Sequence, residues 1–167
     1  MSTLATPQEQ RRNEPPGMPA QGLVDAYRLT DFVVQKPLET IILHVDSPVP
    51  NLKRWLTALK CENAVVITAW NPFSMSLPKD ENLRRNQELG AAIEGAGLLS
   101  TPAIGCARSG NWEPEASFCV FDVTPTVVDA WMQRFGQYAV VLAEKEGTCR
   151  LQWHPAIRSA MASAGAS

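Results

Sequence analysis

The segment KDENLRRNQELGAAIEGAG, residues 79–97, is the longest helical pattern in this chain of 167 residues. At 100° per residue its apolar side chains, Leu89 and Ile93 among them, gather on one side. Two asparagines share that side, with Asn86 at its centre and Asn82 near its edge. A buried amide without partners costs about 1–3 kcal/mol. Both side chains are therefore expected to belong to a buried or cleft-lining polar network.

A polar turn precedes this helix, in the segment Trp70-Asn71-Pro72-Phe73-Ser74. Pro72 disfavours a helical conformation at Asn71, so the chain must turn there. The turn follows an apolar run that is expected to be a buried strand, and ligand sites in open α/β sheets form beyond the carboxyl ends of strands. Because Asn82 and Asn86 lie one helical turn apart, both can reach the same neighbour. The bend and the helix are therefore predicted to meet.

Around this segment, strand-like and helix-like patterns alternate. The two segments on either side of the first helix, 40–45 and 63–69, are expected to pair in parallel through a right-handed crossover. The last helix has a threonine N-cap, a proline in its first turn and a glycine at its end. These patterns predict the α+β class, with a single mixed β-sheet of about five to seven strands packed with three helices. Strands are expected at residues 27–34, 40–45, 63–69, 101–107, 116–123, 138–143 and 149–153, and helices at 52–59, 79–97 and 125–135.

The chain length suits one domain. Residues 1–22 are rich in Pro, Gln, Arg and Glu, and this composition predicts a disordered N-terminal arm. Residues 23–155 are expected to form the globular α+β domain. The Ala- and Ser-rich residues 156–167 are predicted to be a flexible or weakly helical tail.

Composition and charge exclude several classes of protein. The formal net charge is −2 and the pI is near 5.7, so no nucleic-acid partner is expected. No apolar run reaches the ~18 residues of a membrane span and no targeting segment is visible, so we expect a cytoplasmic location and no membrane partner. The histidines and cysteines lack the short spacings of metal sites, so we expect reduced thiols, no metal and no cofactor.

Four short motifs follow one another along the chain. They are Ile67-Thr68-Ala69-Trp70-Asn71-Pro72-x-Ser74; Glu81-Asn82-x-x-Arg85-Asn86-x-x-Leu89; Gly110-x-Trp112 with Glu115 and Ser117-Phe118; and Arg134-Phe135-Gly136-Gln137. In this order and spacing they resemble a bacterial family of small proteins, domain of unknown function 3293, from about residue 27 to about residue 153. The resemblance implies a fold and a site location, and no activity. Two places depart from the family pattern, Tyr138 instead of a frequent asparagine and Glu115-Ala116 instead of an acidic pair.

The candidate site collects the polar side chains of these motifs. Asparagine, glutamine and arginine bind and orient ligands well but transfer protons poorly at neutral pH. Glu115 is the best placed acid and a weak candidate for a general base, because a second titratable partner is not assured. No catalytic residue is assigned, and the phosphate-loop, dinucleotide and nucleophile-elbow motifs are missing. The candidate ligand-binding or network residues are Asn71, Ser74, Asn82, Arg85, Asn86, Trp112 and Gln137.

Two functional hypotheses stay open. The first is a non-catalytic binding or interaction module, whose amide-rich cleft takes a small polar ligand or a peptide segment of a protein partner. The second is an enzyme acting on a nucleotide-like or other small polar metabolite, with Arg85 as anion anchor and Glu115 as proton-transfer group. It requires Glu115 to lie within ~6 Å of the amides. In a third possibility the amides are only scaffold, and Asn86→Leu would raise or preserve stability and leave function intact.

Overall fold

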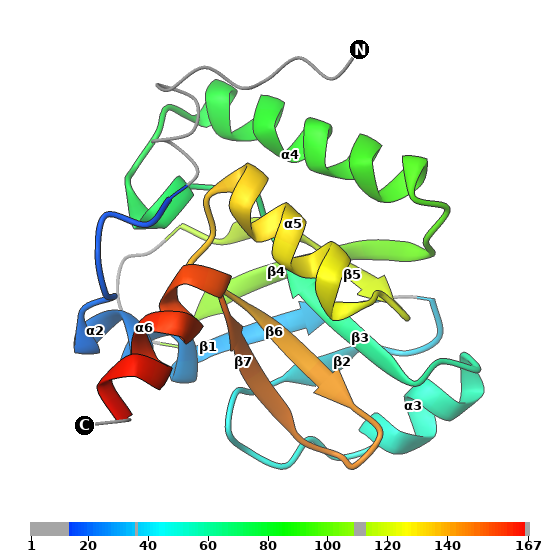
Figure 1. Cartoon of the computed structure of the whole chain (residues 1–167). Coiled ribbons are helices and arrows are strands. Elements are labelled where there is room, and N and C mark those ends of the chain that lie inside the picture. The colour runs from blue at the N-terminus through cyan, green and yellow to red at the C-terminus, as the bar shows by residue number, and fades with distance from the viewer. Residues whose placement is uncertain (1–13, 36, 109–112, 166–167) are drawn as a thin grey trace.

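The computed structural model describes residues 14–35, 37–108 and 113–165. Within them the chain forms one seven-stranded sheet and five α-helices, with a short 3₁₀ turn η1 (Pro72–Ser74) (Figure 1). The α+β class and the strand number are confirmed, whereas the expectation of three helices is wrong. The strands are β1 (Thr30–Val34), β2 (Ile41–Leu43), β3 (Asn63–Ile67), β4 (Ser100–Ala107), β5 (Glu115–Phe121), β6 (Ala139–Glu144) and β7 (Cys149–Trp153). The helices are α2 (Gln21–Arg28), α3 (Leu52–Ala58), α4 (Lys79–Gly95), α5 (Pro125–Phe135) and α6 (Pro155–Gly165).

The sheet has the order β2-β1-β4-β5-β3-β6-β7, and every pair of neighbouring strands is antiparallel. The prediction of a mixed sheet, with segments 40–45 and 63–69 in parallel, is therefore wrong. β2 pairs instead with β1, its predecessor in the chain, with Phe32 opposite Leu43. Such a pair closes a short loop and costs little chain entropy. β3 is occupied on both sides by β5 and β6, so three other strands separate it from β2.

The sheet curls until its two edges approach each other. After β2, Val45 makes a bridge with Cys149 and Pro48 makes one with Thr148. The Asp46 amide donates to the Cys149 carbonyl over 2.9 Å. These contacts connect the segment after β2 with the start of β7, so the two edges of the sheet meet and its inner face is concave. That face holds one core cluster, which includes side chains of α3 such as Leu52, Trp55 and Leu56 together with sheet residues such as Phe32, Leu43, Cys119 and Val141.

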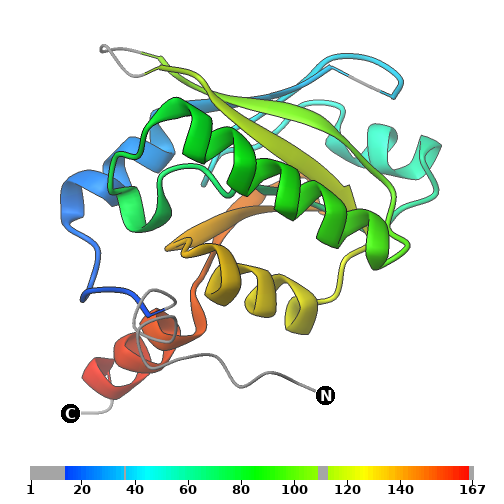
Figure 2. The same ribbon diagram turned by 90° about the horizontal axis from the view of Figure 1, so that it is seen from above.

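The outer face carries a second core cluster, beneath α4 and α5 (Figure 2). Leu89 and Ile93 of α4 pack there with Trp131 and Phe135 of α5 and with residues of β3, β5 and β6. A third, smaller cluster contains Phe73, Tyr138 and Ile157. α2 and α6 lie at the same end of the molecule in both views (Figures 1 and 2). The candidate site therefore stands beyond the carboxyl end of β3, between the outer core and the third cluster.

The two ends of the described chain carry the two helices that were not among the three predicted. Residues 21–28 form α2, so Tyr27 is helical and β1 begins only at Thr30. The alternation assigned to a strand from Tyr27 onward cannot distinguish its first residues from the last turn of a helix. α6 begins at Pro155, with Ile157 buried and Arg158 paired with Asp129 at 2.7 Å. Residues 1–13 of the predicted arm lie outside the described residues, and the division of the chain into arm, domain and tail stays a prediction.

Candidate functional site

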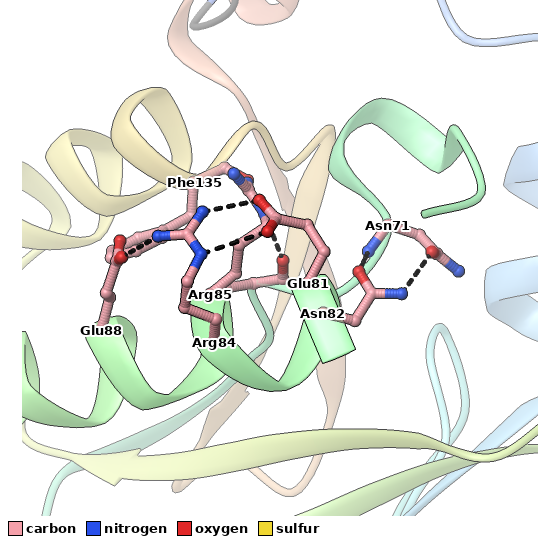
Figure 3. Close-up of polar contacts among 8 residues, drawn as sticks. Asn71, Glu81, Asn82, Arg84, Arg85, Glu88 and Phe135 are labelled. Carbon is pink, nitrogen blue, oxygen red and sulfur yellow. Dashed lines mark hydrogen bonds and ion pairs between the residues drawn. The ribbon is translucent and has the colours of Figure 1, made fainter. Parts of the chain in front are cut away.

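Helix α4 buries the two asparagines. Asn82 is 2% exposed and Asn86 7% exposed, which confirms the burial expected from helical spacing. Asn82 Nδ2 donates to Asn71 Oδ1 over 2.8 Å, and the Asn71 main-chain N–H donates back to Asn82 Oδ1 over 2.8 Å. Figure 3 shows the two amides facing each other. This two-bond fork ties the start of α4 to the bend after β3.

Asn86 makes a second link, between the segment just after β3 and strand β5. Its Oδ1 accepts the Ala69 main-chain N–H over 2.8 Å, and its Nδ2 donates to the Ala116 carbonyl over 2.8 Å. The Thr68 hydroxyl donates to the same Ala116 carbonyl over 2.7 Å. Both ends of the Asn86 amide are thus bonded to main-chain groups, which is the pattern of a structural link rather than of a ligand-facing side chain.

The bend has an unusual backbone. Asn71, Phe73 and Ser74 have φ values of 44°, 48° and 60°, in the left-handed region that costs a residue other than glycine about 1–2 kcal/mol. Several contacts hold it in place. The Phe73 N–H donates to the Gly136 carbonyl over 2.6 Å, and Asn71 Oδ1 also accepts the Leu77 N–H over 3.0 Å. The buried Phe73 ring lies edge-on to Tyr138, with ring centres 5.2 Å apart.

Gly136 fits the bend from the other side. It has a φ of 66° at the end of α5, as the left-handed cap predicted from the sequence requires. A Cβ atom at this position would lie 2.9 Å from Pro72 Cβ, so a side chain would also push the bend away. The next residue, Gln137, is buried, and its Nε2 donates to the carbonyls of Trp70 and Phe135 over 3.2 and 3.3 Å.

Arg85 also serves main-chain carbonyls. Its Nε donates to Ala69 O over 3.0 Å and its Nη2 donates to Phe135 O (Figure 3). Burial lowers the pKa of this half-buried guanidinium. The side chain therefore joins the end of β3 to the end of α5, and two of its donors are already used there. The neighbouring Arg84 pairs with Glu81 and Glu88 at the surface (Figure 3).

Glu115 begins β5 and completes the polar group. Its Oε1 accepts from Asn71 Nδ2 over 3.4 Å, well inside the ~6 Å that a proton-transfer role requires. Burial raises the pKa of this carboxyl, and the hydrogen bond from Asn71 acts in the opposite direction. Burial, with a further contribution from Glu115, raises the pKa of Tyr27 in α2. Tyr27 meets Trp153 edge-on, with ring centres 6.2 Å apart.

The structure thus brings together Asn71, Asn82, Asn86 and Glu115 within one bonded network, with Arg85 and Gln137 at its border with α5. Ser74 takes part through its backbone, because its N–H donates to Asn71 O over 2.9 Å while its side chain is exposed. Trp112 lies outside the described residues. Thr68 and Tyr27 were not predicted as site residues, although Thr68 lies within the first of the four motifs.

Two hollows of about 650 and 280 Å³ open at the surface, and none of the network residues lines either of them. Residues 14–35, 37–108 and 113–165 contain no group of three or more His, Cys, Asp or Glu side chains that could hold a metal ion. In the same residues, no helix is long and apolar enough to cross a membrane. The network's chemistry is that of amides, one carboxyl group, the Thr68 hydroxyl, the Arg85 guanidinium and main-chain groups.

The comparisons with known proteins agree with the sequence motifs. Neither the curated proteins nor the solved structures include a match to the chain. The family model described as "Protein of unknown function (DUF3293)" matches residues 67–140. That stretch runs from the last residue of β3 into β6, is narrower than the range of the resemblance, and contains every residue predicted for the site. This match supports membership of the chain in the DUF3293 family, as the resemblance of the four motifs predicted.

Proposed function

We propose that the chain is a non-catalytic binding module, which recognises a small polar ligand or a peptide segment through Asn71 and Glu115. The observation that carries the proposal is the contact between Asn71 Nδ2 and Glu115 Oε1, 3.4 Å long and formed by two half-buried side chains. It places a hydrogen-bond donor beside a hydrogen-bond acceptor. A peptide unit, a primary amide or the edge of a nucleobase offers the complementary pair.

The length of this contact leaves bonding capacity for a ligand. An N–H···O bond in proteins usually measures about 2.7–3.2 Å, and the bonds of Asn82 and Asn86 to Asn71, Ala69 and Ala116 measure 2.8 Å. The Asn71–Glu115 contact is longer than this range. The second Nδ2 hydrogen of Asn71 and the second carboxyl oxygen of Glu115 add to the capacity.

The strained bend supports the same proposal. Residues in sparsely populated backbone regions cost about 1–3 kcal/mol each and cluster at ligand-binding and catalytic sites. Here the fork between Asn71 and Asn82 fixes the direction of the Asn71 side chain before any ligand arrives. Such pre-organisation reduces the entropy lost on binding. The bacterial, cytoplasmic setting expected from the sequence remains part of the proposal.

A binding screen tests this function. Thermal-shift measurements with nucleosides, nucleotides, amino acids, sugars and N-acetylated dipeptide amides should give a saturable rise of the midpoint with at least one class. Glu115→Ala should weaken that ligand by at least about tenfold, the loss of one charged hydrogen bond, whereas Glu113→Ala in the same segment, where Glu113 is exposed, should leave its affinity unchanged. The absence of any saturable ligand, or equal affinity in both variants, would overturn the proposal.

A second candidate function follows from the pKa of Glu115. Burial moves the pKa of this carboxyl upward, toward the range in which a general acid or base works near neutral pH. An enzyme acting on a nucleotide-like or other small polar metabolite would use Glu115 as proton-transfer group. Glu115→Gln separates the two functions, because it keeps most of the hydrogen bonding and removes the titratable group. Lost turnover with retained binding favours the enzyme, and binding without turnover in the wild type favours the module.

A further inference from the structure

The Asn71–Glu115 pair, which carries the proposed function, has neither surface hollow beside it. Both side chains are half-buried, and neither lines the hollow of about 650 Å³ or that of about 280 Å³. Sites for small molecules usually enclose about 300–1,000 Å³. A ligand of the size of an amino acid or a nucleoside therefore reaches the pair only if a part of the protein moves aside.

Helix α2 is the element that lies against Glu115. This glutamate is directly opposite Gly105 in the pairing of β5 with β4. The methyl group of Thr30 lies 3.7 Å from the position that a Cβ atom at Gly105 would occupy, and its hydroxyl donates to the Ala26 carbonyl of α2 over 2.7 Å. Tyr27 packs against the inner core, and burial, with a contribution from Glu115, raises its pKa. The last turn of α2 therefore covers the pair on the side of Glu115.

Of the α-helices in the described parts of the chain, α2 is the least buried. It has eight residues and no fully buried side chain, whereas each of the other four buries at least one. Its N-cap residue, Ala20, makes no side-chain bond to the first turn. Leu23 and Tyr27, which pack against the core clusters, are only half-buried. Helices shorter than about 12–15 residues are marginal without tertiary contacts, and segments with few buried contacts open locally. α2 can therefore open while the sheet stays folded.

The contacts of α2 show where it would turn. Tyr27 meets Trp153 edge-on with ring centres 6.2 Å apart, and Arg28 pairs with Asp46 over 2.9 Å at the surface. The junction with β1 is firmer, because the Leu29 carbonyl accepts the main-chain N–H of the residue after β4 over 3.0 Å. β1 itself is paired on both sides. Once the ring contact and the ion pair break, α2 is free to swing about Leu29.

We infer that α2 is a gate over the Asn71–Glu115 pair, which swings away from Glu115 to admit a ligand and closes with Tyr27 against it. The identity of the gated groups as a recognition pair rests on the proposed function, whereas the opening of α2 is a property of the free protein. Only the open fraction of molecules accepts a ligand, and this lowers the apparent affinity. Closure removes water from the recognition bonds, and hydrogen bonds are electrostatically stronger in such surroundings.

A thiol at the gated position tests the inference without any ligand. In Glu115→Cys, the opening of α2 should limit the rate at which iodoacetamide alkylates this thiol, followed by peptide mass spectrometry. Adding Tyr27→Ala should raise that rate at least tenfold. Cys106 of the neighbouring strand β4 is half-buried and serves as internal control, with an unchanged rate. The same rate at position 115 with and without Tyr27→Ala, or an equal rise at Cys106, would overturn the gate.

A milder pair of variants decides the question if Tyr27→Ala does not fold. Arg28→Gln removes only the surface ion pair of α2, so alkylation at position 115 should become about twofold to fivefold faster with an unchanged melting midpoint. Arg54→Gln is the matched control, since Arg54 of α3 is also an exposed arginine paired with a carboxylate, Glu39 at 2.7 Å, and the rate should not change. Equal rates in the two variants would overturn the gate.

Hydrogen exchange separates this inference from the proposed function. In the free wild-type protein, the amides of α2 should exchange at least a hundredfold faster than those of α5, and a ligand from the binding screen should slow them. Rapid exchange of α2 in a protein without any ligand would overturn the proposed function alone. A ligand that binds while α2 exchanges as slowly as α5, or that leaves the exchange of α2 unchanged, would overturn the gate alone.

Discussion

The two ends of the amide network differ in how fully their hydrogen-bonding groups are used. At the inner end, Asn86 bonds to main-chain groups of Ala69, just after β3, and of Ala116 in β5 through both of its amide atoms, over 2.8 Å each. At the outer end, Asn71 and Glu115 share one contact of 3.4 Å and both are half-buried. Under the proposed function, one cluster of amides contains both scaffold and recognition surface. The hydrogen-bonding partners of each amide, and not its residue type alone, distinguish the scaffold from the rest of the cluster.

The largest effect on stability is expected at Gly136, where the end of α5 packs against the bend after β3. Gly136→Ala places a Cβ atom 2.9 Å from Pro72 Cβ in a left-handed backbone. The backbone cost and the overpacking together should lower the free energy of unfolding by about 2–4 kcal/mol, measured by urea denaturation. Gly95→Ala, with open space around its Cβ position at the end of α4, is the control and should change stability by no more than about 1 kcal/mol. Equal losses in the two variants would show that the bend does not depend on Gly136.

The next effect tests the inner end alone. Asn86→Leu removes the acceptor of the buried Ala69 N–H, so the free energy of unfolding should fall by about 2–3 kcal/mol. The expectation that leucine would be tolerated at position 86 requires both partners of the polar contact to be replaced by apolar groups. Here one partner is the main chain, which the substitution does not remove. Gln87→Leu, at an exposed position of the same helix, should stay within about 0.5 kcal/mol of wild type. An unchanged stability of Asn86→Leu would remove the scaffold role.

A substitution at Glu115, at the outer end of the network, should raise the stability of the protein instead of lowering it. Burial raises the pKa of Glu115, so the folded protein binds this proton more tightly than the unfolded chain does. Stability contributed by the protonated carboxyl is therefore present below the ordinary pKa and is lost as the pH rises through the folded pKa. Glu115→Gln should melt at a higher temperature than wild type at about pH 8, and the difference should shrink toward about pH 4. The gain should be smaller than the two losses above. A variant that melts lower than wild type at about pH 8 would contradict the burial argument.

The smallest effect is expected at Ser74. Its side chain is exposed and only its backbone N–H bonds within the bend. Ser74→Ala should therefore change the free energy of unfolding by less than about 0.5 kcal/mol. A loss above about 1 kcal/mol in the same denaturation experiment would return the Ser74 hydroxyl to the polar network.

Patterns within short stretches of sequence were sufficient to predict parts of the site. The burial of Asn82 and Asn86 follows from helical spacing, and the fork to Asn71 spans only eleven residues. The Thr124 cap accepts the Val127 N–H and Gly136 adopts the left-handed cap, both as the sequence predicts. Each of these features is decided by side chains within a few turns of one another, so composition and spacing contain enough information.

The pairing of strands that are distant in the sequence could not be predicted from such local patterns. The position of Glu115 beside Asn71 depends on β5 lying next to β3, which no local pattern encodes. The wrong parallel pairing of 40–45 with 63–69 came from a rule for consecutive strands, and here the competition of all seven strands for neighbours decided the order. The carbonyl partners of Arg85 were missed for the same reason, since they lie 16 and 50 residues away in sequence.

The bridges between the segment after β2 and the start of β7 have a consequence for self-association. Unpaired strand edges are the places where other chains add strands and aggregation begins. Here Asp46 and Val49 donate their main-chain N–H groups to Cys149 and Gly147, each over 2.9 Å, so part of each boundary of the sheet is bonded within the same molecule. Cutting or lengthening the loop around Pro48 should release these groups and make the protein precipitate at concentrations at which the intact chain stays clear.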